Sequence, residues 1–165
     1  MVCGTRPHGR VPHQAYPVSE PTGPSTPLSV STSAAPPPAG PYSQAIAVGR
    51  TVYLAGQTPR TPSGERLREA PFEVQVRQTL DNLESVAKAA GSSLHDAVKV
   101  TVYLRPEADV ADFNAIYSAY VSEPLPARTT IVSELTTGAV EAEAVLWVPE
   151  DRSGSSLDAE VDTAP

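Results

Sequence analysis

The stretch AAPPPAGPYSQAIAVGRTVYLAGQ, residues 34–57, contains the border between two kinds of chain. Before it, prolines alternate with Ser and Thr and there is no apolar period. After it, residues 45–48 and 51–55 form two short β-like runs joined by Gly49 and Arg50, with Val52 and Leu54 on one side. This pattern predicts a hairpin that opens the folded part of the chain.

The composition of the two ends of the chain predicts where the folded domain begins and ends. More than half of the 18 prolines lie in residues 1–41, and such chain buries too little apolar surface to offset the entropy of ordering. We therefore expect residues 1–35 to be a disordered N-terminal extension. Residues 150–165 are rich in acidic side chains and are expected to be a flexible tail. The folded domain is predicted to span residues 36–149.

The rest of the domain alternates helical and strand patterns. Residues 71–90 keep a helical apolar period, with Pro71 in the first turn and Gly91 at the stop. A strand is expected at 98–104, a helix at 110–121, and strands at 127–132 and 140–148. The order ββαβαββ predicts an α+β fold whose sheet carries two helices on one face.

The last strand indicates what covers the other face of the sheet. Alternate positions of this strand are apolar and should face the helices, but Val145 and Trp147 fall on the opposite side. Two helices can cover only one face. We therefore infer that the second face packs against another copy of the chain.

Charge and composition exclude several classes of function. The net charge is −7 and the basic residues form no stripe, which disfavours binding of nucleic acid. No apolar run approaches the roughly 20 residues of a membrane helix. Cys3 is the only cysteine, the three histidines are dispersed, and no secretory signal pattern is present. We expect a cytoplasmic protein without a metal site.

Charged residues on the last two strands are candidates for chemistry. Arg128 begins a strand after a proline-stiffened approach, and its guanidinium matches a carboxylate in two parallel hydrogen bonds. Glu141 and Glu143 share one face of the next strand, and either can orient or deprotonate a water. A structural role for Arg128, and neutralisation or solvent exposure of the two acids, fit the same spacing.

Two further side chains have a binding and a structural interpretation. Tyr42 follows a Gly-Pro corner, so its ring can line a pocket or simply pin the first strand. Asn114 follows Phe113 on the second helix and flanks the buried stripe. It is either a pocket residue or a surface amide.

Four motifs follow one another along the folded part of the chain: AGPYSQAIAVGRTVYLAGQTP…SGE, QVRQTLDNLESVAKAAGSSLHDAVKVTVYL, ADFNAIYSAYV…PLPARTT and GAVEAEAV. In this order they resemble the Rid (reactive-intermediate deaminase) family, and its RidA-type (RidA/YjgF-like) imine deaminases most closely. The likeness runs from about residue 36 to 148. It implies a chorismate-mutase-like subunit (the bacillus chorismate mutase or Rid fold) that forms a homotrimer with ligand clefts between subunits.

The resemblance also implies an activity that needs no cofactor. Members hydrolyse 2-imino acids such as 2-iminobutanoate and 2-iminopropanoate, which arise from 2-aminoacrylate-type enamines, to 2-keto acids and ammonia. By the same resemblance, Arg128 clamps the substrate carboxylate and Glu141 orients the attacking water. The other implied pocket residues are Tyr42, Gly56, Asn114 and Thr130.

Three departures from the family pattern bear on these roles. Ala55 stands where many members have a serine, and the loop after Arg128 is about two residues shorter than usual, with Thr136-Thr137 in place of Leu-Pro. A gapless alignment gives the acid role to Glu143 instead of Glu141. The N-terminal extension is the third departure. Two alternatives therefore stand beside imine hydrolysis: a Rid-fold trimer that binds a keto acid or another metabolite without turnover, and a tailoring enzyme for a larger imine or carbonyl.

Overall fold

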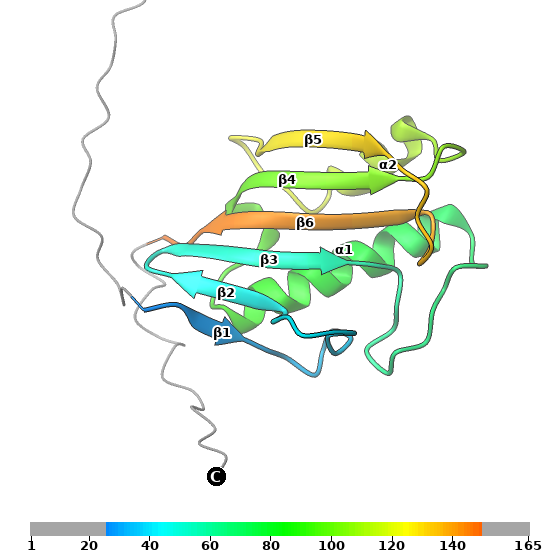
Figure 1. The fold of residues 1–165 in the computed structure, drawn as a ribbon. Helices are drawn as coiled ribbons and strands as arrows, with labels where there is room; N and C mark the ends of the chain where they lie inside the picture. Colours follow the sequence, from blue (N-terminus) through cyan, green and yellow to red (C-terminus); the bar gives the residue numbers. More distant parts are fainter. Residues whose placement is uncertain (1–25, 150–165) are drawn as a thin grey trace, which may run out of the picture.

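The structure, a computed structural model, describes residues 26–149 and is built on one six-stranded sheet (Figure 1). The strands lie in the order β1-β2-β3-β6-β4-β5. The elements along the chain are β1 (Leu28–Val30), β2 (Ala45–Val48), β3 (Thr51–Gln57), α1 (Phe72–Ala89), the 3₁₀ turn η1 (Leu94–Asp96), β4 (Ala97–Leu104), α2 (Val110–Tyr117), β5 (Ala127–Val132) and β6 (Val140–Trp147). The predicted α+β class is confirmed.

The folded part begins earlier than the sequence predicted. β1 lies within the segment expected to be disordered, and it pairs antiparallel with β2 through Leu28–Val30. Gln44, which is buried, ties down the chain that follows: its amide nitrogen donates to the carbonyls of Thr32 and Pro36, and its amide oxygen accepts from the Thr32 N–H at 2.6 Å. The boundary at residue 36 was therefore wrong. The sequence did not reveal this strand, because the three residues of β1 are too few to show an apolar period. The segment after β1 is held by hydrogen bonds to the Gln44 side chain, which no apolar pattern indicates. Residues 1–25 and 150–165 lie outside the described residues.

The apolar stripe of α1 forms the centre of the core. Val76, Leu80, Leu83 and Val86 are at most 1% exposed, and α1 packs on β3 and β6. The backbone stops being helical just before Gly91, whose φ of 71° suits a residue without a side chain. Neither helix of the described region is long and apolar enough to cross a membrane.

The second helix is shorter than expected. The apolar pattern predicted residues 110–121, but α2 ends at Tyr117. The turns that follow bring the Tyr120 hydroxyl to the Asp81 carboxylate of α1 at 2.8 Å, and Val121 stays buried. The apolar pattern therefore continued beyond the helix because these side chains pack after the helix has ended.

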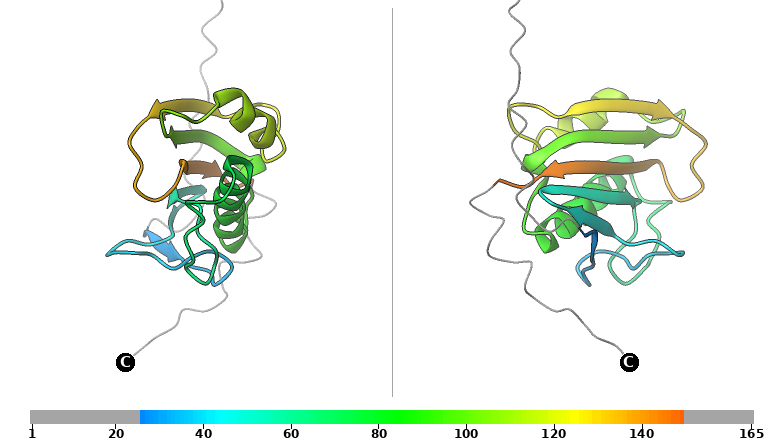
Figure 2. Two further views of the ribbon diagram at one scale, coloured as in Figure 1. Left: turned by 90° about the vertical axis from the view of Figure 1, so that its right-hand side faces the viewer. Right: turned by 60° about the vertical axis from the view of Figure 1, so that its left-hand side comes forward.

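β6 is last along the chain but lies in the middle of the sheet, antiparallel to both β3 and β4. Its residues Val140, Ala142, Ala144 and Leu146 are buried on the side of the helices. Both helices lie on this one side, as Figure 2 shows. The prediction that one face of the sheet has no helix is confirmed.

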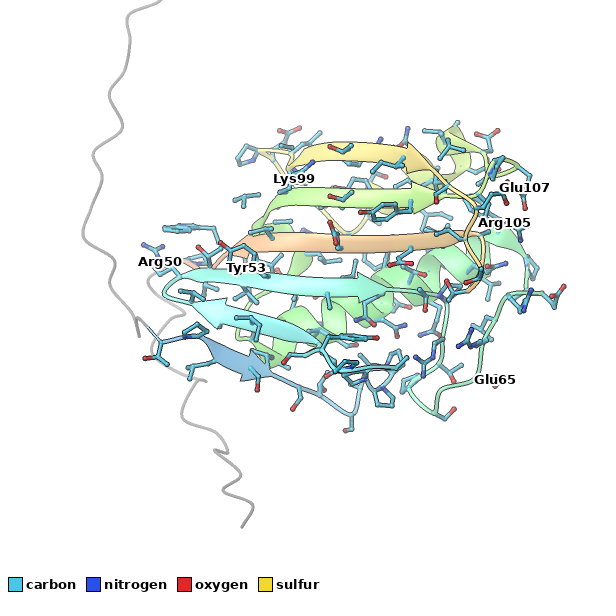
Figure 3. All side chains as sticks on the ribbon, viewed as in Figure 1. Arg50, Tyr53, Glu65, Lys99, Arg105 and Glu107 are labelled. Atoms are coloured by element: carbon cyan, nitrogen blue, oxygen red, sulfur yellow. The ribbon has the colours of Figure 1, made fainter. Side chains whose placement is uncertain are left out.

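The face without helices is partly apolar. Tyr53 and Trp147 are about half exposed there, at 52% and 47%, and the Arg50 guanidinium stacks on the Trp147 ring with its Cζ 4.6 Å from the ring centroid. Figure 3 shows Tyr53 and Lys99 on this side of the sheet and Arg50 at the β2–β3 turn. We call this surface the open face.

Candidate functional site

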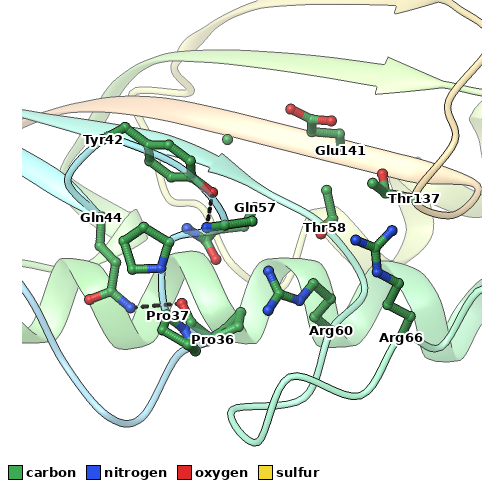
Figure 4. A pocket seen from close by; sticks show the side chains of 13 residues that line it. Pro36, Pro37, Tyr42, Gln44, Gln57, Thr58, Arg60, Arg66, Thr137 and Glu141 are labelled. Atoms are coloured by element: carbon green, nitrogen blue, oxygen red, sulfur yellow. Dashed lines mark hydrogen bonds between the residues drawn. The ribbon is translucent and has the colours of Figure 1, made fainter.

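A pocket of about 200 Å3 opens where β3 and β6 meet two loops (Figure 4). One wall is the proline-rich segment 36–39 together with Tyr42. The floor comes from the end of β3, at Gly56 and Gln57, and from Glu141 near the start of β6. The loop between β3 and α1 supplies Thr58 and two arginines, and Thr137 lies beside them. The volume suits a small metabolite rather than a drug-sized ligand, whose pockets are typically about 300 Å3 or more.

Tyr42 lies in the wall of the pocket and is tied to the proline-rich turn. Its side chain lines the pocket and is half exposed. Its hydroxyl accepts a hydrogen bond from the Ala39 N–H at 3.0 Å, which fixes the ring against the proline-rich turn. The hydroxyl can also donate to a ligand.

Gly56 lies directly under the Glu141 carboxylate. A Cβ built on Gly56 would be 2.6 Å from Glu141 Oε1, closer than any real side chain allows. The pairing of β3 with β6 shifts register between Leu54 and Gln57, so Gly56 sits at a bulge that brings its backbone toward the acid. A glycine is needed here for this close approach.

The carboxyl group of Glu141 is electrostatically unusual. Burial raises its pKa above the ordinary value, and the neighbouring Glu143 carboxylate raises it further. A carboxylate with a raised pKa takes up a proton more readily, as a catalytic base must. Glu143 shares this face of β6 but lines a separate hollow with Tyr53 and Lys99. Of the two acids, Glu141 is the one that shares the pocket with Tyr42 and Gly56.

The other predicted site residues, Arg128, Thr130 and Asn114, lie outside this pocket. Arg128 is on the edge strand β5, on the helix side of the sheet, and its Cζ is 5.6 Å and 5.1 Å from the ring centroids of Phe113 and Tyr117. Thr130 is two residues further along the same face of β5. Asn114 is an exposed residue of α2. None of these three residues lines the pocket that contains Glu141.

The register of the sheet shows how far Arg128 is from Glu141. Arg128 pairs with Val100, and Glu141 pairs with Tyr103, on opposite edges of β4. Their Cα atoms are therefore separated by two strand spacings, about 10 Å across the sheet, and by three residues, about 10 Å along the strands. Their side chains point to opposite faces of the sheet. One copy of the chain does not bring this pair together.

Buried polar side chains of α1 hold the pocket loops, and sequence reasoning missed them. Asn82 is 1% exposed and donates to the carbonyls of Thr58 and Arg60, at 3.2 Å and 2.8 Å. Gln75 donates to the Ala70 carbonyl at 2.7 Å and accepts from the Ala139 N–H at 2.8 Å. A polar residue inside an otherwise apolar helical stripe was the available signal.

Arg60 and Arg66 also line the pocket and were not predicted. The Ser63-Gly64 pair between them is a turn signal from which a small hairpin in this loop could have been predicted. In residues 26–149, no group of three or more His, Cys, Asp or Glu side chains is placed to hold a metal ion.

Comparison with known proteins identifies the family. A family model described as Endoribonuclease L-PSP matches residues 32–147. The chain belongs to this family, the RidA/YjgF-like or Rid family. A RutC family protein from Sulfurisphaera tokodaii is 43% identical over 119 residues, which are 72% of this chain and 95% of that protein. The 2-iminobutanoate/2-iminopropanoate deaminase of Mus musculus is 41% identical over 118 residues, 70% of this chain and 87% of the mouse protein.

A solved Rid structure matches the fold as well. RidA from an Antarctic Psychrobacter species superposes with a TM-score of 0.66 at 37% identity, over 73% of this chain and 99% of that one. The resemblance to the Rid family that the four motifs indicated is confirmed. The family match begins at residue 32, which agrees with folded structure upstream of residue 36.

Proposed function

We propose that this Rid-family protein hydrolyses 2-imino acids to 2-keto acids and ammonia without a cofactor. The observation that carries the proposal is the half-buried Glu141 carboxylate, held against Gly56 in a small pocket with Tyr42. The name of the mouse relative, a 2-iminobutanoate/2-iminopropanoate deaminase, supports the same reaction.

Hydrolysis of a 2-imino acid requires few catalytic groups. The imine carbon beside a carboxylate is electrophilic, so water adds to it, the C–N bond breaks, and the nitrogen leaves as ammonia while the carbon becomes a keto group. Glu141 orients the water, takes up one of its protons and passes it to the nitrogen, and the second proton of the water follows as the C–N bond breaks. Holding the water and the substrate carboxylate in the reactive orientation supplies most of the acceleration of hydrolysis.

The substrate carboxylate needs a cation, and Arg128 is our candidate. Because Arg128 and Glu141 of one copy point to opposite faces, we propose that Arg128 of a neighbouring copy completes the site, together with its Thr130 and Asn114. The apolar side chains of the open face support assembly, since such a surface is unfavourable in water. A homotrimer with the site in each intersubunit cleft satisfies both requirements.

Small imino acids fit the chain better than RNA does, although the family description refers to a ribonuclease. The net charge of −7 disfavours a polyanion, and 200 Å3 holds only a small molecule. Cytoplasmic location stays a prediction from the sequence.

The test is a coupled assay. A threonine dehydratase generates 2-iminobutanoate, and semicarbazide traps whatever imine this protein has not cleared. The wild type is expected to suppress trapping, and Arg128→Ala is expected to lose that effect. If a well-folded wild type binds 2-oxobutanoate but leaves trapping unchanged, the protein is a binder or a tailoring enzyme instead.

A further inference from the structure

The loop between β3 and α1 folds into a small hairpin that presents two arginines on one side. Arg60 and Arg66 face each other across an antiparallel bridge. The turn is closed by hydrogen bonds from Gly64 N–H to the Thr61 carbonyl at 2.8 Å and from Leu67 N–H to the Pro59 carbonyl at 2.8 Å. Residues paired in this way place their Cβ atoms about 4.5–5.5 Å apart on the same face.

Both guanidinium groups line the Glu141 pocket (Figure 4). Neither forms an ion pair with any residue in the range 26–149, and Arg60 Nε is buried without a hydrogen-bond partner there. The Thr137 hydroxyl in the same lining is also buried and has no partner among the described residues. The pocket therefore contains polar groups that the described part of the chain leaves unsatisfied.

Two like charges placed opposite each other destabilise a strand pair. Glu141, in the floor of the pocket, does not compensate for them, because it forms no ion pair with either arginine. Its raised pKa is consistent with this, since a close guanidinium would lower it. An anion bound between Arg60 and Arg66 would relieve the repulsion and accept their hydrogen bonds.

We propose that Arg60 and Arg66 bind a second carboxylate of the ligand, so that the preferred substrates are 2-imino dicarboxylic acids of four or five carbons. The inference rests on the proposed function, because it takes the reacting carbon to lie near Glu141. The first carboxylate is then bound by Arg128 of the neighbouring copy, and the second lies at the opposite end of the pocket. The small volume excludes a bulkier side chain and leaves room for a short acidic one.

The test compares two ligands that differ only in the distal group. 2-Oxoglutarate and 2-oxopentanoate have the same carbon chain, and their binding to the full-length protein is measured by titration calorimetry. The wild type is expected to bind 2-oxoglutarate at least about tenfold more tightly, the effect of one charge-assisted hydrogen bond. The imines are generated by oxidising D-glutamate and D-norvaline with the matching D-amino-acid oxidases, and their clearance is followed by semicarbazide trapping.

The variants assign the preference to particular side chains. Arg60→Gln/Arg66→Gln is expected to abolish the preference for the dicarboxylate. Arg66→Gln alone, at an exposed position, is expected to reduce it without affecting the fold. Arg68→Gln is the matched control, because Arg68 is in the same loop but is exposed and pairs with Glu69 at 3.4 Å. It is expected to keep the preference.

The outcomes separate this inference from the proposed function. Clearance of 2-iminopentanoate with equal affinity for the two keto acids would overturn the inference and leave imine hydrolysis standing. So would a preference for 2-oxoglutarate that survives in the double variant. A preference that depends on the two arginines, without clearance of either imine, would support the second carboxylate site and refute the hydrolysis.

Discussion

Replacing Gly56 with alanine tests whether the position of the Glu141 carboxylate matters. The new Cβ would lie 2.6 Å from Glu141 Oε1, whereas ordinary contact begins at 3.4 Å, so the oxygen has to withdraw by about 0.8 Å. A misplacement of about 1 Å in a catalytic group can reduce the rate about 100-fold. We expect a loss of this order in kcat/KM for 2-iminobutanoate.

The fold should tolerate the same change. The atom in the way is the end of a flexible side chain, and Gly56 does not have the left-handed φ that strains an alanine. We expect the free energy of unfolding to change by less than about 1 kcal/mol. Turnover is measured in the coupled trapping assay and stability by thermal denaturation.

Gly40→Ala is the control for this experiment. Its Cβ would meet the Tyr42 ring at 3.6 Å, an ordinary contact, so turnover and melting temperature should stay near those of the wild type. Full activity of Gly56→Ala would refute the role given to the carboxylate. A large loss of stability would show that the clash falls on the backbone rather than on Glu141.

Three further predictions follow from the core, the acid and the open face. Asn82→Ala removes the donor to the Thr58 and Arg60 carbonyls and should lower the free energy of unfolding by about 3 kcal/mol in urea titrations; a loss near zero would mean that water replaces the amide. Glu141→Gln should raise the melting temperature near neutral pH, because the raised pKa of Glu141 in the folded state means that its ionisation destabilises the fold as pH rises. In acid, where Glu141 is protonated in both states, the gain should disappear. A gain independent of pH would contradict this account. Val145→Asp should dissociate the proposed homotrimer in analytical ultracentrifugation, since it adds a carboxylate to the open face. A variant that still sediments as a trimer would place the interface elsewhere.

Much of the fold was predictable because burial follows simple periods. β6 alternates as expected, and its buried side is the one that faces the helices. Strand β5 has the predicted bounds, since a proline on one side and polar residues on the other delimit it. β1 was not predictable, because three residues carry no period and the tie to Gln44 depends on tertiary structure.

The candidate site was predictable only in part. Tyr42, Gly56 and Glu141 lie in one pocket. A glycine within a strand is compatible with a β-bulge, but the local pattern does not show that this bulge faces Glu141. Arg128 points to the helix face and lies two strands from Glu141, and neither the pairing register nor the strand order is encoded in local patterns. The pairing of Arg60 with Arg66 arises from a loop without periodicity.

The central claim is that hydrolysis needs Glu141 of one copy and Arg128 of the next, and subunit complementation tests it directly. Arg128→Ala and Glu141→Ala are expected to be inactive alone. When they are unfolded together in equal amounts and reassembled, random mixing leaves about a quarter of the intersubunit sites with both residues intact. Recovery of about a quarter of wild-type activity is the predicted result. No recovery from a properly assembled mixture would contradict the shared site, because a site within one copy never regains both residues.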